Sequence, residues 1–342
     1  MKQVFPLFSA AKMSAAPREL EAKLSARISV GEAAGLLAAL LFTCGFSWIL
    51  ATRYTAAADY QIYIRTAFGS TADYYYANWM LPVFSLLNAL PLVPGYIVWS
   101  LLNIAGVFFA ARIFGGKPFL MLVSYQFLAI LYFGQITGII LGGMALFWWG
   151  LNRNRSLLAG IGLLICCTKF QIGVPVGLAM LIFGNIGWST RIKALVVPAV
   201  GFGLSLIIYP GWPIDLLRHI QAVPPDSLAS ISFWRLAGPL ALLFWIPPLV
   251  LPIQREQRIA ALAAAAVIGL PYFQQADLIL LYAFPFGYLP LLGLFGLTFK
   301  FFNWPSYFVL VWIPLIFYFT AMLPVRKIRW KVWQTNRQES DL

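Results

Sequence analysis

Long apolar runs alternate along this chain with short gaps that carry most of its charged and amide residues. From Ala33 onwards the runs recur at roughly 17–25 residues, the length that an α-helix needs to cross the hydrocarbon core of a bilayer. A helix satisfies its backbone hydrogen bonds within one segment, so it is the expected form for such runs. The pattern predicts an all-α polytopic membrane protein with about 10–12 membrane segments.

Basic residues indicate on which side of the membrane each gap lies. The first run, about Ala33–Thr52, is entered from a basic side, and pairs of Arg and Lys recur in later gaps, as is typical of cytoplasmic loops. We therefore expect a cytoplasmic N-terminus and two non-cytoplasmic loops, at 53–80 and 211–233. Leu81–Leu92 is too short to cross and is expected to be a half-crossing or re-entrant piece.

The end of the chain leaves two topologies open. We expect spans at Trp234–Pro252, Leu278–Leu297 and Pro305–Leu323, and this count places the tail outside, although its five basic residues favour the cytoplasm. Either Leu278–Leu323 makes three crossings or a short segment elsewhere does not cross. We divide the chain into a cytoplasmic amphipathic segment (1–30), a single transmembrane domain (31–325) and a basic tail (326–342).

Composition supports an integral, multi-pass protein, and we expect it in a bacterial plasma membrane, the cell inner membrane. The chain is 61% apolar and 10% charged, with a mean hydropathy of +0.81, whereas soluble domains average about 25% charged residues. The net charge of +13 resides in gaps and chain ends, so no nucleic-acid partner is expected. Three scattered cysteines and one histidine, His219, do not form a zinc motif.

The first external loop carries an amphipathic pattern that begins at Asp59. Tyr60, Tyr63, Ile64 and Ala67 follow at helical spacing, which predicts a helix on the membrane surface with its tyrosines at headgroup depth. Asp59 is then either the cap of this helix or a functional carboxylate.

Several amide and ionisable residues interrupt apolar sequence, where a charge costs roughly 2.5–3.5 kcal/mol at mid-depth. Gln135, Lys169 and Asp277, the last with Gln274 and Gln275 before it, all fall on the same side as Asp59 in this topology. Each also has a structural explanation: Lys169 snorkels to the interface, Gln135 caps a hairpin, and Asp277 caps the next helix. Their coincidence on one side favours a shared site.

Five stretches of the chain resemble, in order, the hallmarks of glycosyltransferase family 87, the multi-span, C-type mannosyltransferase-like enzymes. They are DYQIYIRTA (59–67), YYYANWMLPVFSLL (74–87), FGQITGIILGG (133–143), LLICCTKFQIGVPV (163–176) and QQADLILLYAFPF (274–286). The resemblance implies a C-type glycosyltransferase-like helical bundle with an amphipathic non-cytoplasmic first loop. The chain departs from the family pattern at Asn78-Trp79, where proline is expected, and at Gln274-Gln275.

The resemblance also implies inverting transfer of a hexose, typically mannose, from a polyprenyl-phosphate donor to a lipid or glycan acceptor. Asp59 matches the acid that serves as the base, and Lys169 matches a lysine expected at the donor phosphate. Arg65 is a second phosphate candidate, suggested by the residues themselves. On the sugar or acceptor side we expect Gln135, Asp277, Gln274, Tyr63, Tyr76 and His219.

Two other functions fit the same sequence. The departures from the family pattern favour a catalytically degenerate scaffold or subunit of a larger membrane complex, with partner chains. A lipid or solute transporter is less favoured, because we detect no internal repeat and the acids lie at segment ends. No cofactor is required by the pattern, and the alternative is a divalent metal, Mg²⁺ or Mn²⁺, with Asp59 and Asp73 as ligands.

Overall fold

The computed structural model describes residues 27–66, 76–184, 186–222, 231–271, 273–295 and 311–323, which are mainly helical. The first half contains α2 (Val30–Arg53), α3 (Ala58–Thr66), the 3-10 helix η2 (Asn78–Met80), α4 (Leu81–Asn88), α5 (Leu92–Phe114), α6 (Pro118–Leu122), α7 (Tyr125–Phe133), α8 (Thr137–Asn152), α9 (Ser156–Cys166) and α10 (Phe170–Phe183). The second half contains α11 (Trp188–Ile208), α12 (Trp212–Ala222), α13 (Trp234–Ala237), η3 (Gly238–Trp245), α14 (Ile246–Val250), α15 (Arg255–Gly269), η4 (Gln275–Leu278), α16 (Ile279–Tyr282), η5 (Leu289–Leu294) and α19 (Trp312–Met322).

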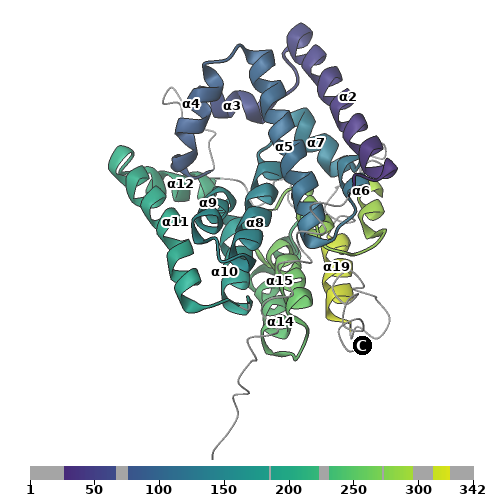
Figure 1. Cartoon of the computed structure of the whole chain (residues 1–342), viewed down its shortest axis with the longest axis vertical. Coiled ribbons are helices and arrows are strands. Elements are labelled where there is room, and N and C mark those ends of the chain that lie inside the picture. The colour runs from purple at the N-terminus through teal and green to yellow at the C-terminus, as the bar shows by residue number, and fades with distance from the viewer. Residues whose placement is uncertain are drawn as a thin grey trace, which may run out of the picture.

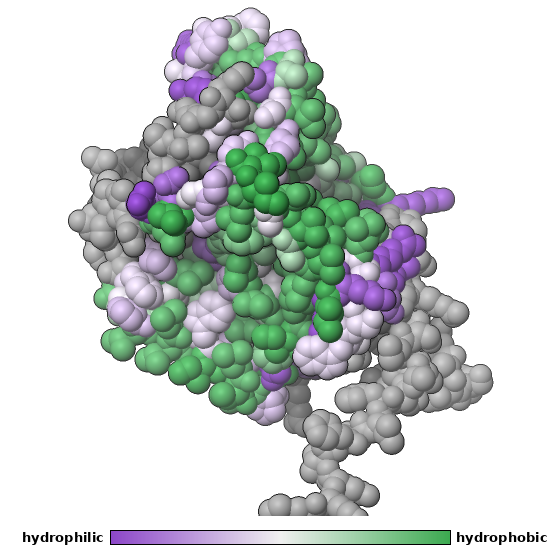
Figure 2. Space-filling view, turned by 90° about the vertical axis from the view of Figure 1, so that its left-hand side faces the viewer, coloured by the Kyte–Doolittle hydropathy of each residue, from purple (hydrophilic) through white to green (hydrophobic). Residues whose placement is uncertain are grey.

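Three of the described helices, α2, α5 and α11, are long and apolar enough to cross a membrane. The pair α7 and α8 would add a fourth span, although it is bent by 113° at its break. α2 and α11 lie along opposite edges of the molecule (Figure 1), and only 11% of the spanning window of α11 is buried. Figure 2 views the molecule from the side of α11 and shows a broad hydrophobic face there. The prediction of an all-α polytopic membrane protein is confirmed.

The second half of the chain is more broken than its apolar pattern predicted. The expected span Trp234–Pro252 contains α13, η3 and α14. The expected span Leu278–Leu297, as far as it is described (to Phe295), contains only short helical pieces. Proline explains the breaks, since it lacks the backbone N–H and clashes with the preceding turn. The described residues contain three or four helices of spanning length and four shorter apolar ones, so the count of 10–12 segments stays a prediction.

α15 forms the centre of the bundle. Every residue from Ile259 to Gly269 is buried, and the helix packs against α10, α19 and η3. A helix that is apolar all round must be enclosed by other elements, and its run of alanines lets neighbouring helices approach closely.

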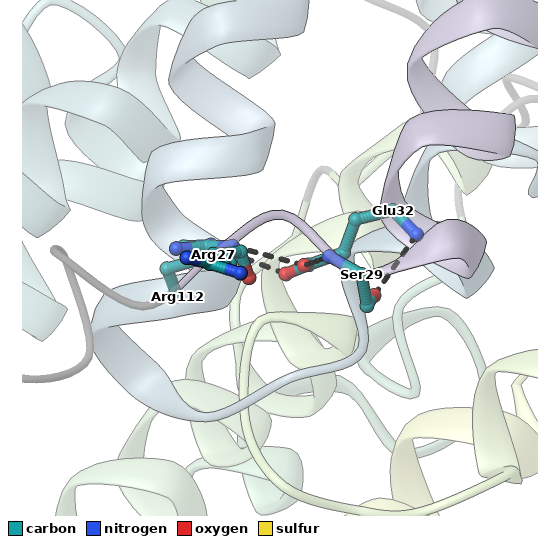
Figure 3. A network of polar contacts seen from close by, with 4 residues as sticks. All are labelled: Arg27, Ser29, Glu32 and Arg112. Atoms are coloured by element: carbon teal, nitrogen blue, oxygen red, sulfur yellow. Dashed lines mark hydrogen bonds and ion pairs between the residues drawn. The ribbon is translucent and has the colours of Figure 1, made fainter.

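An ion pair joins the start of α2 to the end of α5 (Figure 3). Ser29 and Glu32 form a capping box, in which the Ser29 side chain accepts from the Glu32 N–H and the Glu32 carboxylate accepts from the Ser29 N–H. The same carboxylate accepts from Arg112, with 2.9 Å between Arg112 Nη2 and Glu32 Oε2. The basic end of α5 is therefore fixed to the beginning of α2.

The helix predicted in the first external loop is present as α3, but its tyrosines do not face headgroups. Tyr60 and Tyr63 are each 1% exposed, and their rings pack against Trp99 at centroid distances of 6.0 and 5.6 Å. α5 supplies aromatic partners that cover this face of α3, so the tyrosines pack inside the protein, and their depth in the membrane stays a prediction.

Part of the second external loop, predicted over 211–233, is helical as α12. Most of the predicted N-terminal segment (1–30), the basic tail (326–342) and Asp73 lie outside the described residues.

Candidate active site

A buried ion pair lies where α9 turns into α10. Lys169 is 2% exposed and Asp277 is fully buried, and 2.5 Å separate Lys169 Nζ from Asp277 Oδ1. Thr137, the first residue of α8, donates to the same Oδ1 at 3.1 Å and accepts from Lys169 at 3.4 Å. The pair compensates two charges that would otherwise be costly in an apolar interior.

The helix N-terminus at Asp277 stabilises its negative charge, whereas the helix N-terminus at Lys169 destabilises its positive charge. Asp277 Oδ2 accepts from the Gln274 N–H at 3.1 Å, as part of a capping box at the start of η4, where an acid is favourable. Lys169 is the N-cap of α10, and a cation at a helix N-terminus is unfavourable. The position of Lys169 is therefore explained by its partner Asp277 and not by its own helix. Of the explanations left open for Lys169, snorkelling does not apply.

Two amides join the ion pair to Asp59. Gln135 Nε2 donates to Gln274 Oε1 at 2.7 Å, and the Gln135 side chain also lies near enough to the Asp59 carboxyl to lower its pKa. Gln135 is 6% exposed, while Asp59, in the first turn of α3, is half-buried. Asp59 thus occupies the more open side of the group.

The electrostatic environment of Asp59 combines opposing influences. Burial raises the pKa of the Asp59 carboxyl and the nearby Asp277 charge adds to this rise, while the hydrogen bond from Gln135 and the Lys169 charge oppose it; the net pKa is raised. A carboxylate with a raised pKa is a stronger base whenever it is deprotonated.

The turn between α7 and α8 places Gln135 beside Asp59. Gly134 ends α7 with a left-handed φ of 71°, and a Cβ at this position would lie 2.6 Å from Tyr60 Cβ. Trp99 Nε1 donates to the Gly134 carbonyl at 2.8 Å, and the Ala57 N–H donates to the Tyr132 carbonyl at 2.7 Å. Glycine permits both the conformation and the close approach of α3.

A cluster of aromatic side chains packs against the turn that carries Lys169. Trp79 Nε1 donates to Thr168 Oγ1 at 3.1 Å, directly before Lys169. Trp79 also packs edge-on against Trp212 at 5.8 Å, and Trp212 stacks on Phe170 at 6.1 Å. The surface helix α12 is therefore packed onto the turn that carries Lys169.

The structure brings together Asp59, Gln135, Lys169, Gln274 and Asp277, as their common side of the membrane had predicted. Arg65 is exposed and donates to the Gln61 carbonyl of its own helix at 3.1 Å. Tyr63 is buried in the aromatic packing of α3, with Tyr76 5.5 Å from its ring. The backbone of His219 lies in α12. The binding roles proposed for these side chains stay predictions.

Sequence reasoning missed Thr137 and Trp79. Thr137 lies in the quoted Gly-Gln turn stretch, and a hydroxyl at the start of an apolar helix was the available signal. Trp79 was noted only as a departure from proline, so its hydrogen bond to Thr168 could not be anticipated.

The metal prediction has limited support in the described residues. No group of three or more His, Cys, Asp or Glu side chains there could hold a metal ion, and both Asp277 oxygens already accept hydrogen bonds. We derive no step through a metal.

The fold and the site define a helical membrane protein with a carboxylate, a lysine and amides gathered at one buried centre. The model of glycosyltransferase family 87 matches residues 74–284. This match covers more than half of the chain, so the protein belongs to glycosyltransferase family 87 and is a membrane glycosyltransferase. The match includes Gln135, Lys169 and Asp277 but begins after Asp59. No curated protein and no solved structure was found to match the chain.

Proposed function

We propose that this protein moves a hexose, probed first as mannose, from a polyprenyl-phosphate donor to a hydroxyl of a lipid or glycan acceptor. The reaction takes place on the non-cytoplasmic face of a bacterial plasma membrane and inverts the anomeric centre. The observation that carries the proposal is the convergence of Asp59 with Gln135, Lys169 and Asp277 from four separate segments.

In the proposed step Asp59 acts as the general base. Its carboxylate takes the proton of the acceptor hydroxyl while that oxygen attacks the anomeric carbon. The bond from this carbon to the donor phosphate breaks, and its electron pair leaves with the phosphate. A half-buried carboxylate on the open side of the site, with a raised pKa, supports this role.

Lys169 is the proposed cation for the leaving phosphate. An ammonium carries three donors, and Lys169 uses two of them on Asp277 and Thr137. The third donor remains for the leaving phosphate. Asp277 and Thr137 already fix the orientation of the ammonium group, so it need not reorient during the reaction. Arg65 is too exposed to share this position without moving, so we assign it no step.

The test compares sugar transfer by wild type and Asp59→Asn in proteoliposomes, with radiolabelled polyprenyl-phosphate-mannose as donor. Octyl α-mannopyranoside and an extract of bacterial membrane lipids serve as acceptors. Loss of a general base lowers the rate by about 10²–10⁴-fold. Asp215→Asn is the matched control, because Asp215 is also an acid in a first helical turn but has a 55% exposed side chain, paired only with Arg218 at 3.5 Å in the described structure.

Transfer that is lost in Asp59→Asn and kept in Asp215→Asn would support the enzyme and its base together. Transfer that survives in Asp59→Asn would contradict the assignment of the base. Transfer absent from wild type with both acceptors would favour the catalytically degenerate subunit.

A further inference from the structure

Gln135 has one polar atom that the described structure leaves without a partner. Its Nε2 group donates to Gln274 Oε1 at 2.7 Å, and the Gln135 side chain lies near enough to the Asp59 carboxyl to lower its pKa. Its Oε1 atom is buried and accepts no hydrogen bond from any described residue. Gln135 is 94% buried, by its 6% exposure, so the free acceptor lies inside the site and not on the surface.

The orientation of this amide is determined by its neighbours. Oxygen and nitrogen of a glutamine side chain are told apart by the groups around them. Turning the Gln135 amide over would direct its oxygen at Gln274 Oε1, which is also an acceptor. The nitrogen must therefore face Gln274, and the oxygen must face the position that lacks a donor.

A buried carbonyl without a donor is unfavourable, and a ligand that supplies a donor removes this cost. The missing group must donate a hydrogen bond and must fit beside Asp59. A hydroxyl meets both conditions. The acceptor substrate already brings one hydroxyl to Asp59 in the proposed reaction, so a second hydroxyl of the same molecule would arrive with it.

We propose that Gln135 Oε1 accepts a hydrogen bond from a second acceptor hydroxyl, adjacent to the one that Asp59 deprotonates. The inference rests on the proposed function. The Gln135 side chain lies near enough to Asp59 to lower the pKa of its carboxyl, so Oε1 and the Asp59 carboxylate are two acceptors on the same side of the site. Two neighbouring acceptors suit a pair of neighbouring sugar hydroxyls, one bound to each.

This arrangement predicts the chemical class of the acceptor and gives Gln135 a second role. The acceptor is a carbohydrate or another polyol with neighbouring hydroxyls, in contrast to a simple alcohol. Gln135 binds Gln274 through its nitrogen and selects the acceptor through its oxygen. A simple alcohol would leave Oε1 buried without a donor during the reaction, so it would be a poor acceptor.

The experiment is a cycle that changes the enzyme and the acceptor separately. Wild type and Gln135→Met are assayed with octyl α-mannopyranoside and with its four monodeoxy analogues, using the radiolabelled polyprenyl-phosphate-mannose donor. Gln126→Met is the matched control, because Gln126 is a fully buried glutamine of α7 that also has an unpartnered Oε1 but donates to Gly293, far along the chain from Asp59.

We expect one analogue to lose about 10- to 100-fold in kcat/KM with wild type and with Gln126→Met. With Gln135→Met the same analogue should lose less than about twofold relative to the parent glycoside, because the two changes remove one interaction. The analogue that lacks the attacking hydroxyl itself should be inactive with every variant.

For each active analogue, the loss in kcat/KM from Gln135→Met could simply multiply the loss from the missing hydroxyl. That result would overturn the role of Gln135, and it is expected if water occupies the position beside Oε1. The proposed function would fail in a different way, by transfer that is absent or unaffected by Asp59→Asn. Asp59-dependent transfer with multiplying penalties therefore contradicts only the inference about Gln135, whereas absence of Asp59-dependent transfer to any glycoside contradicts both.

Discussion

Two ion pairs in this protein each join a basic side chain to a carboxylate, but they differ in how deeply they are buried. Arg112 and Glu32 meet where α2 begins and α5 ends, with side chains 9% and 15% exposed. Lys169 and Asp277 meet at the heart of the site, with side chains 3% and 0% exposed. The first carboxylate caps its helix and contacts an arginine, while the second is bonded by a lysine, a threonine and a backbone N–H.

The difference indicates what each pair contributes. The Arg112–Glu32 pair is partly exposed, and exposure screens the attraction between charges, so we expect its contribution to stability to be small. A fully buried pair gains little net stability but makes each charge dependent on the other. The Lys169–Asp277 pair is therefore best explained by what it positions, namely the amides and the carboxylate of Asp59.

The largest expected effect is that of breaking the buried pair from one side. Asp277→Asn leaves the Lys169 ammonium without its counter-charge and should lower the free energy of unfolding by about 3–5 kcal/mol. Asp277→Asn combined with Lys169→Met removes both charges and should recover most of this loss. Thermal unfolding in detergent measures both, and both variants should lack transfer.

Equal destabilisation of the single and the double variant would contradict this explanation of the pair. In that case the two side chains would contribute through packing and not through their mutual charge compensation.

The fold was predictable where the length of an uninterrupted apolar run determines the helix. The run predicted at Ala33–Thr52 is α2, since a spanning run with a cap before it has few alternatives. The pattern could not reveal that the described part of Leu278–Leu297, to Phe295, is divided into short pieces. Apolar composition is the same for a continuous span and for a broken segment enclosed by other helices, and the path of a proline-rich stretch depends on its neighbours.

The site was predictable as a set of residues but not as a set of contacts. Gln135, Lys169 and Asp277 were conspicuous because polar groups inside apolar runs are expensive. Their hydrogen bonds depend on helix rotation and on the αL turn at Gly134, which sequence spacing does not determine. Tyr63 was expected on the sugar or acceptor side, and the sequence did not reveal that its ring stacks on Phe84 in the aromatic core.

The second prediction compares a glycine from each region. Gly115 ends α5 near Arg112 with a φ of 83°, and an added Cβ would have only ordinary contacts, the nearest at 3.7 Å to Pro285. Gly134 has a φ of 71° and a Cβ there would lie 2.6 Å from Tyr60 Cβ. Gly115→Ala should cost about 1–2 kcal/mol from its backbone alone. Gly134→Ala should cost more and should also reduce transfer, because α3 must shift.

Thermal unfolding and transfer assays on both variants test this comparison. Equal losses of stability, with transfer unchanged in both, would show that the approach of Gly134 to Tyr60 does not position Asp59.

The third prediction concerns the cost of keeping Asp59 ionised. Burial raises the pKa of its carboxyl in the folded protein, so the folded state binds this proton more tightly than the unfolded state does. Stability is then highest below the ordinary pKa and falls as pH rises through the raised value. Asp59→Asn removes the ionisation and should unfold at a higher temperature than wild type at about pH 8, with the difference closing towards about pH 4.

A variant that is less stable than wild type at every pH would contradict this assignment, since it would make Asp59 a structural carboxylate like Glu32. Asp215→Asn is again the control, and its exposed position predicts no pH-dependent difference.

The smallest expected effect is that of neutralising the pair at the edge. Glu32→Gln keeps an amide that can complete the capping box with Ser29 but removes the charge facing Arg112. Because both side chains are partly exposed, the variant should lose about 1 kcal/mol or less and keep full transfer. Thermal unfolding at low and high salt measures the loss, which salt should reduce. A loss as large as that of Asp277→Asn would mean that burial is not what distinguishes the two pairs. The special position of Lys169 and Asp277 would then have to come from their contacts with Thr137 and Gln274 alone.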